Sequence, residues 1–518
     1  MFEDKLTLTF DCGTQSVRSI LFDQKGCLLH ISKYAFPNPY YSHYSGWAEQ
    51  DATYWWYSLA ESAKKLKREI SETLFDKIES VSVTSMRDTY IPLDEHFMPL
   101  RASILWLDQR TAKCEEKLKF FPELAFRLVG MRKAVQETRR ASVSNWLIEN
   151  EKENWSKMRY WASLAAWFNY MLTGSLVDSI GNQVGHIPFN YKEKRWLRPN
   201  ELKFGISPVP PEKLVPLVPS GTVIGVVNKK GSQFTGLKEG VKVVATGTDK
   251  GCETLGSGCI TDKMAALSFG TTSTVQLSTK KYVEPQKYLP SYPAIIPDRY
   301  NPEVEIFRGY WMITWFIREF GANAVEEARI KGVSVEEVLN QSIEKIPPGC
   351  EGLLLQPYWG PGLKIPEAKG SIIGFSDYHT KDHVYKAIIE GINYGLMDGL
   401  DNVSKNAKTE VKAIVANGGG ARSKEICQLT SDMFGLPLSV CQTTETSGLG
   451  SAIASFVGTG HFSGYEEAVS QMVHYKYTLQ PNERNQKLYS RLYKEYYLPL
   501  YSQLRPLYKT VRKIIEEN

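Results

Sequence analysis

The sequence has few of the features that mark zinc-binding, disulfide-stabilised or membrane-spanning proteins. Its eight cysteines are scattered, with no C-x-x-C pair and no cysteine–histidine cluster at zinc spacing. Several lie in apolar runs, where a free thiol behaves as a small hydrophobe. The longest apolar stretch, LAAWFNYML, is too short to span a bilayer. The pattern predicts a protein of a reducing compartment, the cytoplasm, with no membrane partner.

The sequence also lacks a large excess of positive or negative charge. The net charge is only +5 over 518 residues, and lysine-rich stretches such as AKKLKREI alternate with apolar residues. Solvated helix faces explain such stretches better than nucleic-acid binding does. A strand-like run begins by about Lys5, which leaves no room for a signal peptide before it. We therefore expect no nucleic-acid partner and no signal peptide.

The chain alternates between strand-like and helix-like runs, which predicts the α/β class and, at this length, more than one core. Its opening differs, because KLTLTF, VRSILFD and GCLLHISKY are short runs separated by glycine turns, as in an antiparallel meander. A second strand–turn–strand pattern, MAALSFGTTSTVQLST, spans residues 264–279. We interpret the two patterns as one architectural unit used twice. A boundary near residues 255–262 then gives domains 1–258 and 259–518.

Three glycine turns are candidates for ligand binding. CGTQS and FGTTS form the tips of the two hairpins, and the glycines 418–420 follow the strand-like run VKAIVAN. Ser423 is suited to cap the helix after this run, and Gly435 to end it. Turn N–H groups and hydroxyls donate to phosphate oxygens, and a helix N-terminus favours anions. A connection without a ligand is the alternative for each turn.

Two acids lie beside such turns. Asp11 suits a phosphate that carries Mg²⁺, because Mg²⁺ prefers carboxylates and water; the alternative is an aspartate that only bonds its own backbone. Asp249 follows the run KVVATG at a glycine-rich turn, where a carboxylate could act as general base on a hydroxyl. One acid for the metal and one for the acceptor is the division that phosphoryl transfer requires.

A long helix is predicted from about Lys381. Its apolar face carries a residue every four positions, namely Val384, Ile388, Ile392, Leu396 and Leu400. Gly391, Gly395 and Gly399 run beside this face, each at a cost of roughly 1 kcal/mol relative to alanine. A smooth stripe that admits another backbone would offset that cost. Tight packing is one interpretation, and a helix at a hinge or against a nucleotide loop is the other.

Taken together, these motifs resemble the FGGY carbohydrate kinases of the actin-like ATPase superfamily. DCGTQSVR matches the D-x-G-T-x-S-x-R phosphate motif of that family, and LSFGTTS is similar to its second phosphate hairpin. The segment GTDKGCETLGSG resembles the one that carries the catalytic aspartate. GSIIGFSDYHTKDHVYKAIIEG resembles the C-terminal signature, with Phe375 where a smaller aliphatic is usual. NGGGARSKEICQLTSDMFGLPL and GLGSAIASFVGTG look like the adenosine-binding turn and the small-residue helix that follows.

The resemblance implies two actin-like (ribonuclease H-like) domains, each a mixed sheet flanked by helices, with a central cleft for ATP and substrate. Asp249 would be the catalytic base and would contact the acceptor, while Asp11 would hold Mg²⁺ directly or through water. The remaining nucleotide contacts implied are Thr14, Gln15, Ser16, Arg18, Gly270 and Thr271 for the phosphates, and Gly418, Gly419 and Ser423 for adenosine. Domain closure would exclude water as a competing acceptor.

The acceptor residues should lie in the first half of the chain. Arg87 and Asp88 follow a strand-like run, where family members that act on glycerol carry an Arg-Glu pair. The Gln-Met-His-Gly of many xylulose kinases is absent. Asp88 could accept bonds from two sugar hydroxyls and Arg87 could donate, with a surface ion pair as the alternative.

Two tryptophan motifs offer further candidates. In ILWLDQR, Trp106 presents a ring for sugar C–H groups beside the polar Asp108 and Arg110, and a structural tryptophan is the alternative. In SGWAEQD, Trp47 and Glu49 reach the cleft or belong to the scaffold.

The expected function is ATP-dependent phosphorylation of a hydroxyl on a small sugar or polyol, such as a pentulose or a glycerol-like polyol. Two alternatives stay open: an actin-like ATPase that acts as a conformational or chaperone machine, and a kinase of a non-sugar furanosyl signalling molecule. The chain lacks an obvious separate peptide-binding domain, which counts against a chaperone. The identity of the acceptor and the oligomeric state, a homodimer included, are left open.

Overall fold

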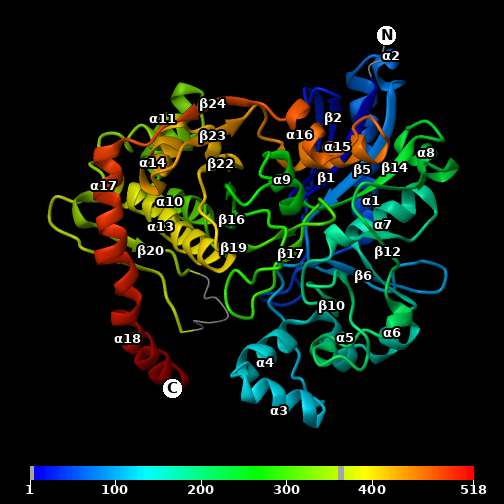
Figure 1. Cartoon of the computed structure of the whole chain (residues 1–518), viewed down its shortest axis with the longest axis horizontal. Coiled ribbons are helices and arrows are strands. Elements are labelled where there is room, and N and C mark those ends of the chain that lie inside the picture. The colour runs from blue at the N-terminus through cyan, green and yellow to red at the C-terminus, as the bar shows by residue number, and fades with distance from the viewer. Residues whose placement is uncertain (1–4, 360–366, 518) are drawn as a thin grey trace. The chain divides into compact units, whose positions relative to one another are not determined.

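The computed structural model describes residues 5–359 and 367–517, which form two compact units (Figure 1). Unit 1 consists of Met1–Gly258, Pro290–Asn301 and Glu445–His474, and unit 2 of Cys259–Leu289, Pro302–Thr444 and Tyr475–Asn518. Two segments from the later part of the chain thus pack with unit 1, which a single boundary at residue 258 did not predict. Among the described residues, no helix is both long and apolar enough to cross a membrane.

Unit 1 is built on a six-stranded mixed sheet. In spatial order the strands are β13 (Thr222–Val226), β14 (Lys242–Thr248), β5 (Ile78–Ser85), β1 (Leu6–Cys12), β2 (Ser16–Asp23) and β3 (Leu28–Ala35). The first three strands along the chain form the predicted antiparallel meander, whereas β5 is parallel to β1 and β14 is parallel to β5. The pairing places Cys12, Ser85 and Thr248 side by side. One edge of the sheet therefore collects the residues that follow β1, β5 and β14.

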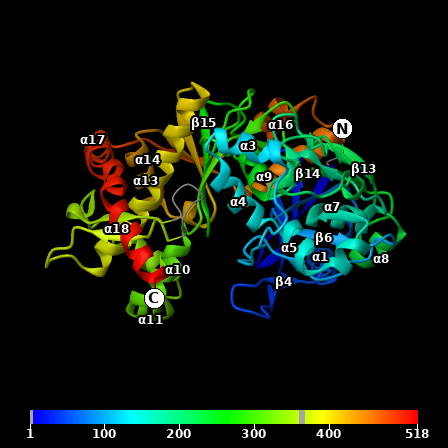
Figure 2. The ribbon, with the colours of Figure 1, turned by 90° about the horizontal axis from the view of Figure 1, so that it is seen from below.

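The two faces of this sheet carry different side chains, because residues alternate between faces along a strand. Leu8 and Phe10 are fully buried in the apolar core beneath α1 (Ala52–Glu69) and α7 (Leu164–Thr173), two helices that lie side by side (Figures 1 and 2). On the other face the hydroxyl of Thr7 donates to Ser455, 3.0 Å away on α15 (Thr446–Gly458). The small side chains of this face let a helix from the end of the chain lie against the sheet.

Helix α15 also lies against α9 (Asp249–Gly256), with almost no space between the two backbones. A Cβ added at Gly450 would lie 1.8 Å from the carbonyl oxygen of Cys252, and one at Gly256 would lie 2.0 Å from that of Thr446. Glycine at both positions permits a contact that any side chain would prevent. This contact explains why Glu445–His474 belongs to unit 1.

Smaller sheets and helices complete unit 1. Its other strands are β4 (Glu49–Gln50), β6 (Tyr90–Leu93), β7 (Ser103–Ile104), β8 (Tyr160–Ser163), β9 (Asp178–Ser179), β10 (Phe189–Asn190), β11 (Arg195–Trp196), β12 (Leu217–Val218), β17 (Tyr292–Pro293) and β18 (Tyr300–Asn301). Its other helices are α2 (Glu72–Phe75), α3 (Phe120–Leu128), α4 (Arg132–Ala141), α5 (Val143–Asn150), α6 (Lys152–Lys157), α8 (Lys229–Thr235) and α16 (Tyr465–Met472).

Unit 2 repeats the plan with its own six-stranded sheet. In spatial order its strands are β19 (Glu303–Ile306), β16 (Ser273–Gln276), β15 (Met264–Phe269), β22 (Ala413–Asn417), β23 (Leu438–Cys441) and β24 (Tyr475–Leu479). β15 and β16 form the second predicted hairpin, and β15 runs parallel to β22. Two mixed sheets flanked by helices confirm the predicted α/β class.

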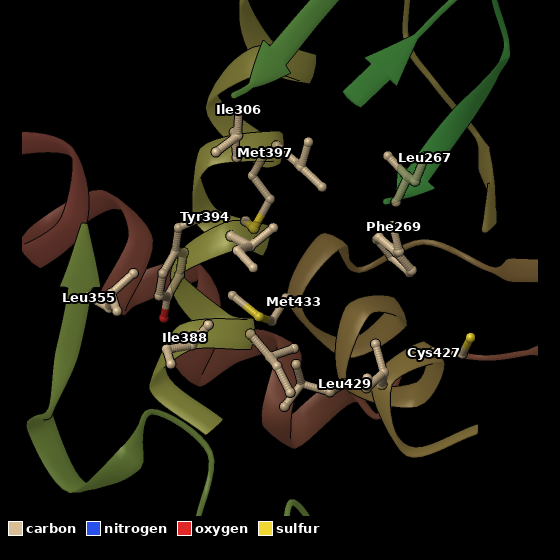
Figure 3. Packing of buried hydrophobic residues seen from close by; sticks show 14 of the residues in the cluster. Leu267, Phe269, Ile306, Leu355, Ile388, Tyr394, Met397, Cys427, Leu429 and Met433 are labelled. Atoms are coloured by element: carbon tan, nitrogen blue, oxygen red, sulfur yellow. The ribbon is translucent and has the colours of Figure 1, made fainter. Parts of the chain in front are cut away.

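The helices of unit 2 enclose one large core (Figure 3). They are α10 (Trp311–Phe320), α11 (Ala322–Lys331), α12 (Val335–Asn340), α13 (Lys381–Ala407), α14 (Lys424–Phe434), α17 (Glu483–Leu492) and α18 (Leu498–Glu516), and a small sheet joins β20 (Leu354–Gln356) to β21 (Ser371–Ile373). Three predicted helix boundaries are confirmed: α13 begins at Lys381, and α14 is capped by Ser423 at its start and by Gly435, with φ 63°, at its end.

The glycine stripe of α13 is explained by packing. A Cβ added at Gly391 would lie 2.5 Å from the carbonyl oxygen of Leu355, and one at Gly395 would lie 2.7 Å from Cδ1 of Ile306. At Gly399 the nearest atom would be Cβ of Val304, 2.9 Å away. The stripe therefore lets strands β19 and β20 approach the helix closely. Of the two interpretations of the stripe, the structure supports tight packing.

We predict that Gly391→Ala destabilises unit 2 although alanine is the better helix former. The clash with the Leu355 backbone should cost about 1–3 kcal/mol, against a propensity gain of at most ~1 kcal/mol. Denaturant unfolding measures the net change. Lys405→Ala, an exposed substitution in the same helix, should stay within about 0.5 kcal/mol of wild type. A Gly391→Ala variant more stable than wild type would contradict the packing explanation.

Candidate active site

Three neighbouring strands of unit 1 bring the predicted site residues to one edge of its sheet. The turn at Thr14 follows β1, Arg87 and Asp88 follow β5, and Asp249 follows β14. Because Cys12, Ser85 and Thr248 are in register, these three groups begin at the same level of the sheet. In α/β proteins the carboxyl ends of parallel strands are where ligands bind.

Asp11, the last but one residue of β1, lies in a strongly acidic environment. Its carboxylate is buried and receives a bond from the Arg18 guanidinium at 3.3 Å, while the same Nη1 atom donates to Glu445 at 2.9 Å. The pKa of Asp11 is raised to about 7, mainly because the carboxyl is buried; Arg18 lowers it, and the charges of Asp249, Glu445 and Glu253 add to the rise. The site therefore holds more negative charge than the nearby Arg18 offsets.

Asp249 does not lie in a glycine-rich turn, as the sequence suggested, but is the first residue of α9. Thr248 caps this helix by accepting the N–H of Gly251 at 3.2 Å. The half-buried carboxylate of Asp249 accepts the N–H of Lys250 at 2.8 Å, at the helix end where an acid is favoured. Glycine 251 thus belongs to the first helical turn, and the helix fixes the backbone at Asp249.

Glu253 follows Asp249 by one helical turn and was not predicted as a site residue. It is buried and pairs with Lys250 at 3.3 Å, and its negative charge raises the pKa of Asp11. The four-residue spacing in DKGCE would have revealed it, had Thr248 been recognised as a helix cap. Glu445 was missed for another reason, since nothing in the sequence links it to Arg18.

The first hairpin tip lies beside Trp106. The indole Nε1 donates to the hydroxyl of Thr14 at 3.0 Å, and Trp106 keeps 41% of its surface exposed. Gln15 at the tip is exposed, whereas Ser16 is already a buried residue of β2. The structure thus brings one expected phosphate residue, Thr14, next to one expected acceptor residue, Trp106.

Asp88 is held by a histidine for which the sequence suggested no chemical role. Its two carboxylate oxygens bond the backbone N–H of His186 at 3.0 Å and the ring Nδ1 at 2.6 Å. Burial alone would raise the pKa of Asp88, but the charge and hydrogen bonds of His186, together with Arg87, lower it. Asp88 adopts φ 52°, a left-handed conformation that aspartate tolerates better than most residues. Asp88 therefore forms an ion pair with His186.

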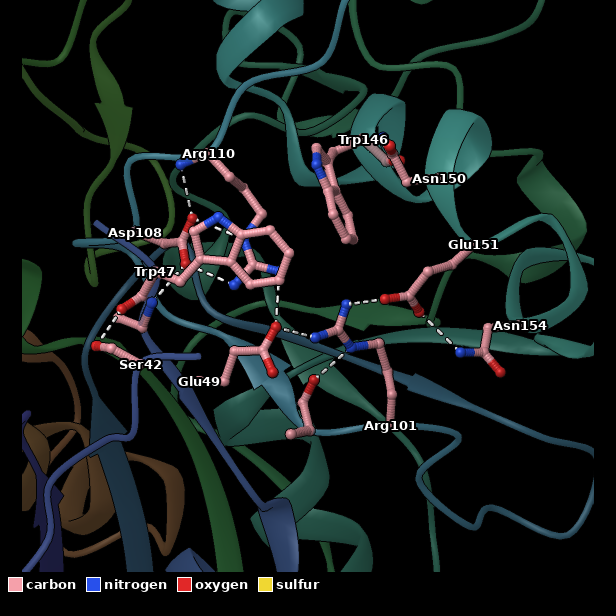
Figure 4. Close-up of polar contacts among 12 residues, drawn as sticks. Ser42, Trp47, Glu49, Arg101, Asp108, Arg110, Trp146, Asn150, Glu151 and Asn154 are labelled. Atoms are coloured by element: carbon pink, nitrogen blue, oxygen red, sulfur yellow. Dashed lines mark hydrogen bonds and ion pairs between the residues drawn. The ribbon is translucent and has the colours of Figure 1, made fainter. Parts of the chain in front are cut away.

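Four other residues of the two tryptophan motifs, Trp47, Glu49, Asp108 and Arg110, contact one another in a network of ion pairs and ring contacts (Figure 4). The Arg110 guanidinium lies 3.7 Å from the centre of the Trp47 ring and donates to Asp108 at 2.8 Å. It also pairs with Glu49 at 2.6 Å, and Arg101 contacts Glu49 from the other side. Only 3% of the side chains of Asp108 and Arg110 is exposed. The buried ion pairs of Arg110 with Glu49 and Asp108 therefore brace this part of unit 1.

Unit 2 brings its two predicted nucleotide turns together on its own sheet. Ser268 pairs with Asn417, so the Gly270 tip and the turn at Gly418 follow neighbouring parallel strands. Gly418 has φ 81°, where a Cβ would also lie 2.9 Å from the Phe269 carbonyl oxygen, whereas nothing lies within 4 Å of a Cβ at Gly419. The turn is thus packed on one side and open at Gly419.

Thr271 and Ser423 form hydrogen bonds at the starts of helices α10 and α14. The carbonyl oxygens of Gly270 and Thr271 accept N–H groups at the start of α10, at 3.0 and 3.4 Å. The Ser423 hydroxyl accepts the N–H of Ile426 at 3.2 Å and donates to Glu425 at 2.7 Å. Ser423 is therefore primarily the cap of α14, next to the glycine turn.

Comparison with known proteins gives a consistent result. The model of the N-terminal domain of the FGGY family of carbohydrate kinases matches residues 6–256, and that of the C-terminal domain matches residues 265–459. The chain is 28% identical to a xylulose kinase of Lactococcus lactis, over 94% of each protein, and 25% identical to a gluconokinase of Bacillus subtilis, over 94% of this chain and 93% of that protein.

The fold likewise matches a solved structure. A gluconate kinase from Lactobacillus acidophilus superimposes with a TM-score of 0.82 at 21% identity, covering 98% of this chain and all of that one. The predicted actin-like architecture is thereby confirmed. Because the two family models together cover most of the sequence, the chain belongs to the FGGY family of carbohydrate kinases, enzymes that use ATP to phosphorylate an alcohol group.

Proposed function

We propose that this carbohydrate kinase phosphorylates a hydroxyl of a small sugar or polyol, a ketose such as a pentulose or a glycerol-like polyol, with Asp249 as the general base. The observation that carries the proposal is the register of β1, β5 and β14. It brings the first hairpin tip, our candidate acceptor residues Arg87 and Asp88, and the carboxylate of Asp249 to one edge of one sheet. The xylulose kinase and gluconokinase relatives support a sugar or sugar-derived acceptor.

Asp249 is suited to accept the proton of the attacking hydroxyl. Its backbone is fixed by β14 on one side and by the capped first turn of α9 on the other. General-base catalysis requires a carboxylate held within hydrogen-bond reach of the hydroxyl. Asp249 leaves β14 at the level of the sheet where the segment that carries Arg87 and Asp88 leaves β5. Arg87 and Asp88 are our candidates for binding the acceptor.

The acid cluster fits Mg²⁺, with Asp11 as the ligand. Asp11 is buried, and the negative charges of Asp249, Glu253 and Glu445 act on its carboxyl, with Arg18 as the opposing charge. No group of three or more histidine, cysteine or acidic side chains in residues 5–359 and 367–517 forms a metal site by itself. Proteins bind Mg²⁺ through one or two carboxylates together with substrate phosphates and water, and in this proposal Asp11 would supply the carboxylate.

ATP would supply the transferred phosphoryl group, and Mg²⁺ would offset its charge. In unit 1 the turn of Thr14 and Gln15 offers N–H and hydroxyl donors to phosphate oxygens, and Arg18 offers a positive charge. In unit 2 the same role falls to Gly270 and Thr271. The open face at Gly419, beside Gly418 and Ser423, is our candidate surface for adenosine.

On the acceptor side we assign three groups. The exposed ring of Trp106 would pack against sugar C–H groups, next to Thr14. Arg87 would donate to acceptor oxygens, and the Asp88–His186 pair would present a further acceptor and donor. The oligomeric state stays open, with a homodimer as one possibility, and light scattering would determine it.

A panel of acceptors tests the proposal directly. Purified protein with MgATP is offered D-xylulose, D-gluconate and glycerol, and both ADP release and the mass of the product are followed. We expect phosphorylation of at least one of these compounds, and stabilisation of the protein by that compound in thermal shift. ADP release that is independent of every acceptor would contradict the proposal.

We predict that Asp249→Asn lowers kcat by at least ~10², because the variant cannot accept the hydroxyl proton. Binding of ATP, measured by calorimetry, should be retained. Asp76→Asn, an exposed substitution before the start of β5, serves as the control and should leave kcat unchanged. Near-normal turnover of the Asp249→Asn variant would remove Asp249 from its proposed role.

We predict that Asp11→Asn raises the Mg²⁺ concentration needed for half-maximal activity, because it removes the charged ligand. The measurement is a magnesium titration at saturating ATP and acceptor. Glu445→Gln is the comparison: this residue bonds Arg18, so its effect on the titration should be smaller. A titration of Asp11→Asn that superimposes on that of wild type would argue against a metal contact.

Asp11 also predicts how stability depends on pH in the absence of metal. Its pKa is about 7 in the folded chain, against an ordinary value of 3.8. Between these values the folded state binds a proton that the unfolded state has released, so stability falls as pH rises. Asp11→Asn removes this loss. The free energy of unfolding of the variant should therefore rise relative to that of wild type by about 2–3 kcal/mol between pH 5 and pH 8. Denaturant unfolding in EDTA measures the gap, and an equal gap at both pH values would contradict the prediction.

A further inference from the structure

The segment Pro290–Asn301, here called the return segment, belongs to unit 1 although both flanking stretches belong to unit 2. Its strands β17 and β18 pair as a small hairpin. Nζ of Lys194 donates to the carbonyl oxygens of Pro297 at 2.5 Å and Arg299 at 2.8 Å. The hydroxyl of Tyr300 donates to the carbonyl oxygen of Lys192 at 2.7 Å. The return segment is thus fastened to unit 1 at its turn and at its second strand.

Ile295 of the return segment packs against the backbone on either side of Asp249. Only 1% of its surface is exposed. Its Cδ1 atom lies 2.3 Å from where a Cβ would stand on Gly247, and 3.2 Å from the corresponding position on Gly251. Gly247 belongs to the end of β14 and Gly251 to the first turn of α9. One methyl group therefore occupies the corner where the strand becomes the helix.

Tyr292 of the return segment packs against the acceptor residues. Its ring centre lies 5.5 Å from Cζ of Arg87 and 5.6 Å from the ring of Tyr191, edge to face. The Tyr191 hydroxyl in turn donates to the carbonyl oxygen of Gly185 at 2.9 Å, next to the His186 that holds Asp88. An aromatic face attracts a nearby guanidinium and so restrains its position.

We propose that Ile295 and Tyr292 are positioning residues, through which the return segment aligns Asp249 and Arg87 with the acceptor. Ile295 fixes the angle at which the chain leaves β14, and hence the place of the Asp249 carboxylate. Tyr292 fixes the plane of the Arg87 guanidinium. This inference rests on the proposed function, in which Asp249 is the base and Arg87 binds the acceptor. Reaction rates are sensitive to such placement, because a shift of about 1 Å can cost 10²-fold.

The Ile295 contact is tested by removing a methyl group from Ile295 and adding one to Gly251, on the other side of the contact. Ile295→Val removes Cδ1, and Gly251→Ala adds a methyl that meets the same atom. We expect each single variant to lower kcat by roughly 3- to 10-fold with little change in the KM for ATP. The double variant should recover much of the loss, because the new methyl fills the vacated space. Ile78→Val, a buried substitution at the start of β5, is the matched control and should keep the wild-type kcat.

The Tyr292 contact is tested through the KM of the acceptor. Tyr292→Ala should raise it by about fivefold, with the KM for ATP unchanged, whereas Tyr292→Phe keeps the ring and should raise it less. The acceptor is whichever of D-xylulose, D-gluconate and glycerol the wild type phosphorylates fastest. A purely structural role would lower the melting temperature of these variants without such a split between KM and kcat.

The outcomes separate this inference from the proposed function. The inference is wrong if the wild type phosphorylates an acceptor but two results are negative. These are a double variant whose kcat does not exceed that of Gly251→Ala, and a Tyr292→Ala variant with a wild-type KM for the acceptor. The return segment would then have a packing role alone. If the wild type phosphorylates none of the three compounds, the proposed function fails and the inference fails with it.

Discussion

The structure of unit 1 depends on the parallel pairing of β1, β5 and β14. Backbone hydrogen bonds hold Cys12, Ser85 and Thr248 level, so that three segments far apart in sequence end at one edge. A slip of one residue would also turn every side chain of a strand to the opposite face of the sheet. That face cannot change, because one side of the sheet is packed with large apolar groups and the other with small hydroxyls. The register, and the site with it, is therefore fixed by the core.

The hydroxyl face has a direct consequence for the electrostatics of the site. Thr7 and Ser82 are small enough for α15 to lie against the sheet, and each shares a hydrogen bond with a serine of that helix. Glu445 immediately precedes α15 and reaches Arg18, which also bonds Asp11. Packing on one face of the sheet thus adds an acid to the cluster at its edge. The raised pKa of Asp11 follows from the burial and the neighbouring acids that this packing creates.

Residues of one short motif have separate tasks. In WLDQR, Trp106 is exposed beside Thr14, while two positions further on Asp108 is buried against Arg110. The ion pairs of Arg110 with Glu49 and Asp108 are buried (Figure 4). They restrain the loop that also carries Trp106. Similarly, Asp88 is restrained by His186, from a distant part of the chain, while Arg87 lies against Tyr292. Exposed side chains at the sheet edge therefore depend on buried ones for their direction.

The sequence by itself determined what depends on neighbouring residues: the two hairpins, the start of α13, the Ser423 cap and Gly435 end of α14, and the glycine turns that follow strands. The order of these motifs was sufficient to recognise the family. Tertiary structure alone decided which acids meet at Asp11, that His186 holds Asp88, and that Tyr292 and Ile295 return to unit 1. Local hydrogen bonds and backbone preferences are encoded within a few residues. A contact such as that of Arg18 with Glu445 forms only because α15 packs against the sheet that carries Arg18.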